Sequence, residues 1–318
     1  MKGKEDTVVT SGQIKSLKYM TANALIAALA NTRLSREQVQ RVIEIHGSEF
    51  ADLVRDAIAN ALKSALGETS VASAQASAVS NQLVDEKAES NYAYPPEYKG
   101  PKPIEDQIRA IAKIFNLVPT KALEYAQHLP ALPSGAEGWF AVPSVDALAK
   151  KRFPEVEDPA EKYCRAVQFA FDKINSSREC YSWYDVPIDK EHLRITDRTA
   201  RFMESIAQTQ SGDVLIIAAQ LGLRHRNRSV NLARNLFQTN EYGITTLSVL
   251  SIVLVHPERF ASSEGLDIDC SGDEYCPFGE VDFLHSPCLG SSGCELDFCA
   301  PDCDSWNEFY GSGSVFDA

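Results

Sequence analysis

No run of 18 consecutive apolar residues occurs in this sequence, although hydrophobic residues make up 44% of it. The longest apolar stretch, at 244–255, is interrupted by Thr and Ser and is too short to cross a bilayer. The N-terminal residues also lack the apolar core and the small-residue cleavage site of a secretory signal. We therefore expect a cytoplasmic protein with no membrane partner.

The sequence signatures of several large enzyme classes are absent as well. The chain has no G-x-x-x-x-G-K-[ST] or G-x-G-x-x-G phosphate-binding loop, no G-x-S-x-G nucleophile turn and no H-E-x-x-H zinc motif. No two cysteines have the C-x₂-C spacing of a zinc ribbon. These motifs therefore indicate neither a reaction nor a cofactor, and whether the chain is an enzyme stays undecided at this point.

Positive charge is missing from the last part of the chain, because no Lys or Arg follows Arg259. Residues 260–318 contain 13 Asp and Glu residues, which account for the whole formal net charge of −13, so that the first 259 residues are neutral. Such an asymmetry is typical of an interaction surface or a solvated acidic tail. An acidic chain is also a poor candidate for binding nucleic acid over its whole surface.

The patterns that are present predict an α+β protein, with a helix-rich N-terminal half and a small mixed sheet in the C-terminal half. Apolar residues at helical spacing, preceded by capping residues, dominate the first half of the main body, and short alternating stretches follow. We expect the last eight residues, GSGSVFDA, to be frayed. The predicted organisation is a helical region at 1–67, an Ala/Ser- and Pro-rich linker at 68–103, an α+β main domain at 104–260 and an acidic cysteine-rich tail at 261–318.

One stretch of the main domain concentrates positive charge. An apolar run at 213–220, which predicts a buried strand, leads into a basic loop and then into a helix capped by Asn227 or Ser229. Each exposed cation at a helix N-terminus costs about 0.3–1 kcal/mol, so this loop requires an anionic partner. The candidate ligand-binding residues are Arg224, His225, Arg226, Arg228 and Arg234.

Three kinds of partner would meet this requirement. A strand that leads into a helix N-terminus is the usual phosphate site of α/β sheets, and arginine suits an oxyanion, so an anion- or phosphate-binding protein for a nucleotide or nucleic acid is our main prediction. In a second interpretation, the arginines are solvated and pair with nearby carboxylates. In a third, the loop docks the acidic tail, and the protein is a structural or interaction protein whose other partners the sequence does not indicate.

Carboxylates near the start of the tail offer a different chemistry. Asp267 and Asp269 are two residues apart and would project from one face of a strand, and Asp273 follows after a turn. Such carboxylates can hold Mg²⁺ and would support a metal-dependent phosphodiester hydrolase, which is the alternative function. The spacing also resembles the start of a calcium-binding EF-hand loop, but Phe278 stands where that loop has its bidentate Glu.

Six of the eight cysteines lie between positions 270 and 303. Together with a nearby histidine, some of them have a spacing that could close a tetrahedral zinc site, whereas disulfides and free thiols are the alternatives. The candidate zinc ligands are His285, Cys288, Cys299 and Cys303.

Overall fold

The computed structural model describes residues 90–178, 180–182, 188–261, 265–276, 283–292 and 295–318. The chain divides into two units, at 1–82 and 83–318. The first unit, which contains the predicted helical region 1–67, lies outside the described residues, as does the predicted linker up to residue 89.

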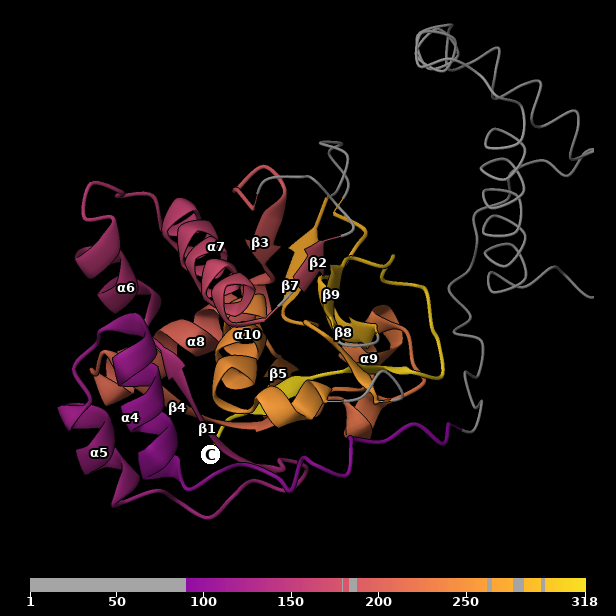
Figure 1. The fold of residues 1–318 in the computed structure, drawn as a ribbon, viewed down its shortest axis with the longest axis horizontal. Helices are drawn as coiled ribbons and strands as arrows, with labels where there is room; N and C mark the ends of the chain where they lie inside the picture. Colours follow the sequence, from indigo (N-terminus) through magenta and orange to yellow (C-terminus); the bar gives the residue numbers. More distant parts are fainter. Residues whose placement is uncertain (1–89, 179, 183–187, 262–264, 277–282, 293–294) are drawn as a thin grey trace, which may run out of the picture. The chain divides into compact units, whose positions relative to one another are not determined.

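The second unit has an α+β fold, as the sequence predicts. Its described part contains seven helices, concentrated between residues 104 and 210, and three small sheets that are mostly C-terminal (Figure 1). Short 3₁₀ turns follow strand β4 and helix α10. The helices are α4 (Ile104–Phe115), α5 (Thr120–Ala126), α6 (Val145–Arg152), α7 (Pro159–Ser177), α8 (Asp197–Gln210), α9 (Val230–Leu236) and α10 (Thr246–Val255).

The first sheet, which contains the two longest strands, is antiparallel throughout and has the strand order β1-β4-β11-β5. A second sheet has the order β10-β6-β8-β9-β2 and is mixed, because its two outer pairs are parallel. The first sheet contains β1 (Gly138–Pro143), β4 (Val214–Gln220), β11 (Ser314–Phe316) and β5 (Glu241–Gly243). The second contains β10 (Tyr310–Ser312), β6 (Asp267–Asp269), β8 (Cys288–Ser292), β9 (Glu295–Cys299) and β2 (Cys180–Ser182), and a separate pair joins β3 (Leu193–Ile195) to β7 (Asp273–Tyr275).

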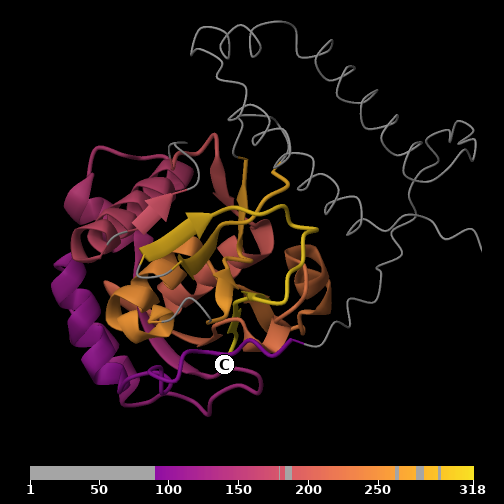
Figure 2. The same ribbon diagram turned by 45° about the vertical axis from the view of Figure 1, so that its right-hand side comes forward.

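Local signals explain why the helices begin where they do. Asp158 accepts hydrogen bonds from two backbone N–H groups in the first turn of α7, and Pro159 occupies the first helical position. Ser144 caps α6 in the same way. Helix α10 is apolar on all sides because it lies within the core, in contact with both α7 and β1 (Figures 1 and 2).

Two glutamine side chains complete the hydrogen bonding of the first sheet. The amide of Gln107, on α4, accepts from the N–H of Ala141 and donates to the carbonyl of Trp139 along the outer edge of β1. The amide of Gln210, on α8, makes the same two bonds with Ile216 of β4, at 2.7 Å each, beyond the end of β11. Unpaired backbone groups at exposed strand edges can pair with other chains, and these two side chains occupy such groups on β1 and β4.

The acidic tail is built into the fold. We expected its last residues to be frayed, but Ser314–Phe316 form β11, which lies between β4 and β5 and pairs with both. Val315 and Phe316 are buried there, so the apolar pair at the end of the chain supplies core contacts. The tail also provides β6, β8, β9 and β10 of the second sheet and β7 of the third.

Residues 90–103, which fall in the predicted linker, are extended and contact the tail. The carbonyl of Ala93 accepts from the N–H of Leu266 at 3.0 Å, and the rings of Tyr92 and Phe309 pack edge to face with centroids 5.9 Å apart. The Tyr98 side chain is buried in the core. This stretch is therefore held against the body from residue 90 onward.

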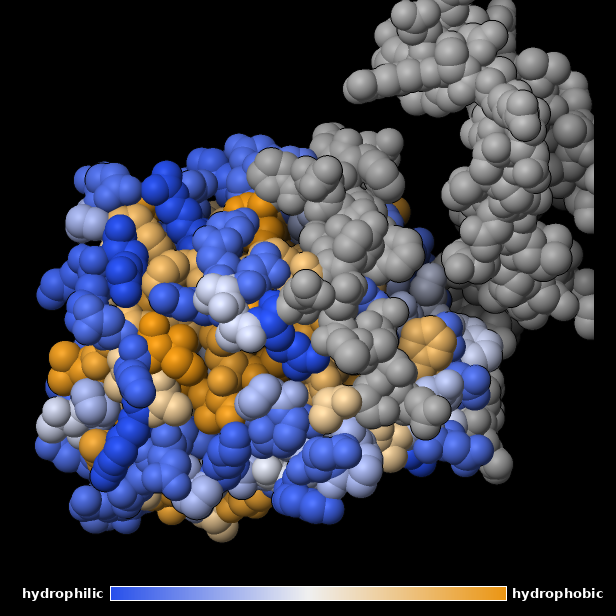
Figure 3. Space-filling model, in the orientation of Figure 1, coloured by the Kyte–Doolittle hydropathy of each residue, from blue (hydrophilic) through white to orange (hydrophobic). Residues whose placement is uncertain are grey.

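None of the described helices has the length and apolar character needed to span a membrane. On the face shown in Figure 3, hydrophilic residues dominate the outer surfaces of the helices, and hydrophobic residues show mainly in the middle, between α4 and α10.

Candidate functional site

The predicted strand, basic loop and helix are all present, but their setting differs from that of a phosphate-binding α/β sheet. Strand β4 is buried along its whole length, and Ser229 caps α9 by accepting from the N–H of Leu232 at 3.2 Å. Both neighbours of β4 run antiparallel to it. The precedent of parallel sheets therefore does not apply here, and α9, with seven residues, is too short to add a substantial dipole.

A buried carboxylate of the main domain provides an anionic partner for the basic loop. Glu241, whose side chain is completely buried on β5, accepts from Nε of Arg224 at 3.1 Å and contacts Nε2 of His225 at 2.8 Å. Ser314 of β11 also donates to it, at 2.7 Å. Burial by itself would raise the pKa of Glu241, but the hydrogen bonds from His225 and Ser314 lower it to about 2. The second interpretation, pairing with a nearby carboxylate, thus describes Arg224.

The other loop arginines contact a backbone carbonyl and an imidazole ring. Arg226 donates to the carbonyl of Tyr92 at 3.0 Å, and Arg228 lies 3.3 Å from Nδ1 of His225. Within the described part of the chain, neither forms an ion pair with a carboxylate. The positive charge of the loop is therefore only partly compensated, because Glu241 pairs with Arg224 and not with these two side chains.

Arg234 joins α9 to the tail. Its guanidinium donates to the carbonyls of Ser271 and Asp273, at 2.9 and 2.7 Å, and lies 3.8 Å from the sulfur of Cys303. Arg234 therefore contacts the tail through backbone carbonyls and a thiol, whereas the side chain of Asn231, on the same helix, donates to the carboxylate of Asp304 at 2.7 Å.

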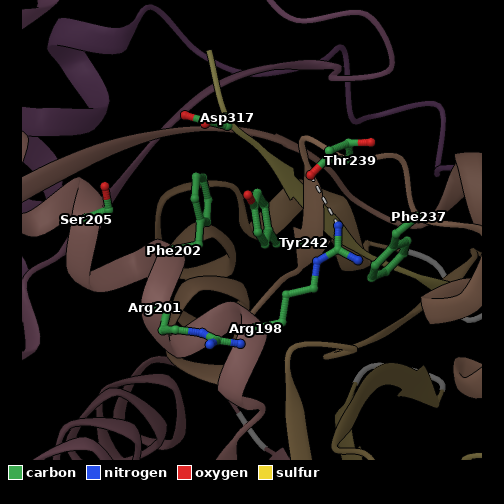
Figure 4. A pocket seen from close by; sticks show the side chains of 8 residues that line it. All are labelled: Arg198, Arg201, Phe202, Ser205, Phe237, Thr239, Tyr242 and Asp317. Atoms are coloured by element: carbon green, nitrogen blue, oxygen red, sulfur yellow. Dashed lines mark hydrogen bonds between the residues drawn. The ribbon is translucent and has the colours of Figure 1, made fainter.

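A groove lies on the other side of β5 from the Glu241 side chain, because Tyr242 points to the opposite face of the strand. The groove has a volume of about 620 Å³ and is open to solvent. One wall is formed by Arg198, Arg201, Phe202 and Ser205 of α8. The other is formed by Phe237, Thr239, Tyr242 and Asp317, and these eight residues define what we call the α8 groove (Figure 4).

The guanidinium of Arg198 is held in a fixed position in its wall of this groove. It donates to three backbone carbonyls, of which that of Glu241 is nearest at 2.7 Å. It also lies 5.0 Å from the ring centre of Tyr242, which in turn stacks on Phe202 with centroids 4.1 Å apart and planes 2° from parallel. Figure 4 shows the guanidinium between the rings of Tyr242 and Phe237. The positive charge is therefore positioned before any ligand binds.

Arg201 brings a second positive charge to the same wall. Its Nε donates to the carbonyl of Asp197 at 3.2 Å, and the residue is exposed. No described carboxylate forms an ion pair with Arg198 or Arg201, and both lie near the N-terminus of α8, where the helix dipole adds to the positive potential. Asp317 lies across the groove from them (Figure 4), and its N–H is bonded to the carbonyl of Asn240. The groove is thus cationic on one side and acidic on the other.

Sequence reasoning did not find this groove. Arg198 and Arg201 have the spacing of neighbours on one helix face, but a pair of exposed arginines on a helix is common. Their significance depends on β5, about 40 residues later in the chain, which no local pattern connects to α8.

The structure separates the three candidate carboxylates. Asp267 and Asp269 project from one face of β6, as expected. The carboxylate of Asp273 instead accepts from the N–H of Thr246, at the start of α10, and from the hydroxyl of Tyr163, at 2.6 and 2.5 Å. Asp273 therefore serves to cap the buried helix α10 and does not join the other two.

Polar side chains form a row across four strands of the second sheet. The strand registers place Ser312 of β10, Asp269 of β6, Cys288 of β8 and Cys299 of β9 opposite one another in turn. We call these four residues the polar row. Burial raises the pKa of Asp269 to about 7, although hydrogen bonds from Cys288 and Ser312 oppose the change. Burial, together with the charge of Asp269, raises the pKa of the neighbouring Asp267 to about 8.

The four candidate zinc ligands do not come together as a set. Cys288 and Cys299 face each other in the polar row, whereas Cys303 lies beside Arg234 and His285 is bridged through its backbone to Tyr275. In the ranges that the structure covers, no group of three or more His, Cys, Asp or Glu residues is arranged to hold a metal ion.

Comparison of the chain with protein-family models, with curated proteins and with solved structures found no match, so the function is argued from the residues themselves.

Proposed function

We propose that this protein binds a small phosphate-bearing ligand, such as a nucleotide, in the α8 groove. The observation that carries the proposal is that Arg198 and Arg201 line one wall of this groove and that neither forms an ion pair with a described carboxylate. Arginine matches the geometry of phosphate and is less strongly hydrated than lysine, so it loses less on binding. The volume of about 620 Å³ lies within the range typical of small-molecule sites.

The two arginines would act in different ways. Arg198 is already bonded to three carbonyls and stacked against Tyr242, so it contributes a fixed positive field. Arg201 has one bond to a backbone carbonyl, through Nε, which leaves its two Nη groups for fork-like contact with phosphate oxygens. Because the chain carries a net charge of −13, these local charges are needed to attract an anion.

The opposite wall favours a ligand with hydrogen-bond donors. Asp317 would repel a second phosphate but accept bonds from hydroxyl or amino groups, and the hydroxyls of Ser205 and Thr239 can both donate and accept. A nucleotide or a sugar phosphate has both kinds of group, whereas inorganic phosphate has no counterpart for Asp317. The groove therefore supports a phosphorylated, hydroxyl-bearing ligand.

The basic loop lies next to this groove and would extend its positive field. The ring of His225 packs against that of Phe237, with centroids 5.2 Å apart, and Phe237 lines the groove. Arg226 and Arg228 therefore remain candidates for more distant phosphates, which a nucleic acid would bring and a mononucleotide would not.

The test is a titration of the protein with a fluorescent adenine nucleotide at low ionic strength. Arg201→Ala should weaken binding roughly 10- to 100-fold, because a hydrogen bond to a charged group contributes about 1.5–3 kcal/mol. The matched control is Arg109→Ala, since Arg109 is an exposed arginine on α4 that pairs with Glu105. Unchanged affinity in an Arg198→Ala, Arg201→Ala double variant would refute the proposal, and tighter binding of a labelled single-stranded oligonucleotide would favour nucleic acid as the ligand.

We also infer a cytoplasmic location. Free thiols are usual in a reducing compartment. The described chain has free thiols at Cys164, Cys180, Cys270, Cys288, Cys299 and Cys303. The hydrolase alternative has less support, because Asp273 is engaged at the start of α10. Docking of the tail on the basic loop is supported by Arg234, whose acceptors are backbone carbonyls, and by Arg224, whose guanidinium lies 5.9 Å from the ring centre of Phe316.

A further inference from the structure

Two thiols of the polar row face each other on adjacent strands. Cys288 of β8 and Cys299 of β9 are direct partners in an antiparallel ladder. Two residues further along the same ladder, the N–H of Ser286 donates to the carbonyl of Pro301 at 3.1 Å, so Cys288 and Cys299 also occupy a hydrogen-bonded position. Cα atoms at such positions are about 5.5 Å apart, which is within the range that a disulfide requires.

The two cysteines are direct neighbours across the ladder but differ in accessibility. Cys288 is completely buried, and the strand register places it between Cys299 on one side and Asp269 on the other. Cys299 is only partly buried. A reagent from solution can therefore reach Cys299 first, and Cys288 is placed to react with whatever forms there.

We propose that Cys288 and Cys299 are a modification site at which a small-molecule disulfide reversibly oxidises the pair to a cross-strand disulfide. The Cys299 thiolate attacks one sulfur of the small disulfide, which releases one small thiol and leaves a mixed disulfide. The Cys288 sulfur, whose proton passes to Asp269, then attacks the sulfur of Cys299 and expels the second small thiolate, which takes up this proton and leaves as a thiol. Two protein thiols are oxidised and one small disulfide is reduced to two thiols.

The modification would change the polar row directly. In the reduced protein the Cys288 thiol lies opposite Asp269 on the neighbouring strand, and Ser312 donates a hydrogen bond to the Asp269 carboxylate at 3.4 Å. Formation of the disulfide removes the thiol donor and leaves Asp269 with Ser312. The oxidation state of the pair is thereby linked to the hydrogen bonding of a buried carboxylate.

The direct test maps disulfides in the full-length protein after incubation with glutathione disulfide. Free thiols are blocked with N-ethylmaleimide, and the digest is analysed by mass spectrometry without reduction. We expect a peptide pair cross-linked through Cys288 and Cys299 that dithiothreitol removes. Cys164, buried on α7 and bonded to the carbonyl of Leu193, should stay reduced and serves as the internal control. Failure of the pair to oxidise, or a disulfide from either cysteine to a different partner, would overturn the proposal.

Two single variants test the order of the steps. In Cys288→Ser the mixed disulfide at Cys299 has no resolving thiol, so glutathione should remain attached to most molecules. In Cys299→Ser the entry thiol is missing, so Cys288 should stay unmodified. Equal modification of both variants would contradict the assigned roles. The mapping on the unaltered chain does not depend on either variant folding.

Discussion

Asp269→Asn should make this protein more stable at pH 8 and should reduce the loss of stability as the pH rises. Asp269 is buried, and its pKa rises from an ordinary value of 3.8 to about 7. The folded state therefore holds this proton more tightly than the unfolded state. Its contribution to stability is complete below pH 3.8, and it is lost as the pH rises to about 7.

The size of the effect follows from the same change in pKa. A difference between 3.8 and about 7 corresponds to about 4 kcal/mol of unfolding free energy, as an upper limit. Asp267 reduces this figure, because the charge of Asp269 contributes to its raised pKa and the two groups titrate together. Relative to the unaltered protein, the variant should thus become more stable as the pH rises from 5 to 8. The unfolding free energy of the variant should still fall with pH, but less steeply, because Asp267 still titrates.

Urea unfolding followed by tryptophan fluorescence at several pH values between 5 and 8 would measure this difference. Asp146→Asn is the control, because the Asp146 side chain is 84% exposed and its only described ion pair is a long one to Lys162, at 3.8 Å. The control should follow the pH dependence of the unaltered protein. If the difference in stability between Asp269→Asn and the unaltered protein were the same at pH 5 and pH 8, the argument from burial would be wrong.

Three further predictions concern the fold. Glu241→Gln should lower the unfolding free energy at pH 7 by about 3–5 kcal/mol, because it removes a buried charge that Arg224 and His225 contact. Since the pKa of Glu241 is lowered from 4.5 to about 2, the unaltered protein should lose this contribution as the pH falls from 4.5 towards 2, and acid unfolding of the Gln variant should lack that component. Gln107→Ala should cost about 1–3 kcal/mol in urea unfolding by leaving the edge of β1 unpaired, whereas Gln168→Ala, on the surface of α7, should cost little. Deletion of residues 314–318 should abolish cooperative thermal unfolding seen by circular dichroism, because β11 lies inside the first sheet; a cooperative transition at an unchanged temperature would contradict that role.

Much of the main domain could be predicted because its signals are local. The start of α7 is specified by Asp158 and Pro159 within two positions, and the apolar run at 214–220 is long enough to identify a buried strand. Such features depend on neighbours in the sequence, so they can be predicted without knowledge of the fold.

The tail could not be predicted in the same way. Its described strands have three to five residues, which is too short for a clear alternation, and its acidic composition is typical of solvated segments. In β6 the alternation is present, with Ile268 facing the core, but the other face carries Asp267 and Asp269. A strand face that is polar and buried has the same residue composition as a face that is exposed to solvent. The burial of Asp269 therefore becomes visible only when the neighbouring strands are known.

The basic loop shows how far a charge argument extends. Local electrostatics required an anion near Arg224, and the fold supplies one in Glu241, on a strand that joins the sheet only through β11. The sequence thus established the need for a counter-charge but not its source, since ion pairing is decided by tertiary contacts. The same reasoning applied to the structure leads to α8: Arg198 and Arg201 are placed together, near a helix N-terminus, and the described fold gives neither of them a carboxylate. The fold compensates Arg224 internally and leaves these two arginines at an open groove, and this difference is the basis on which we propose the α8 groove as the anion site.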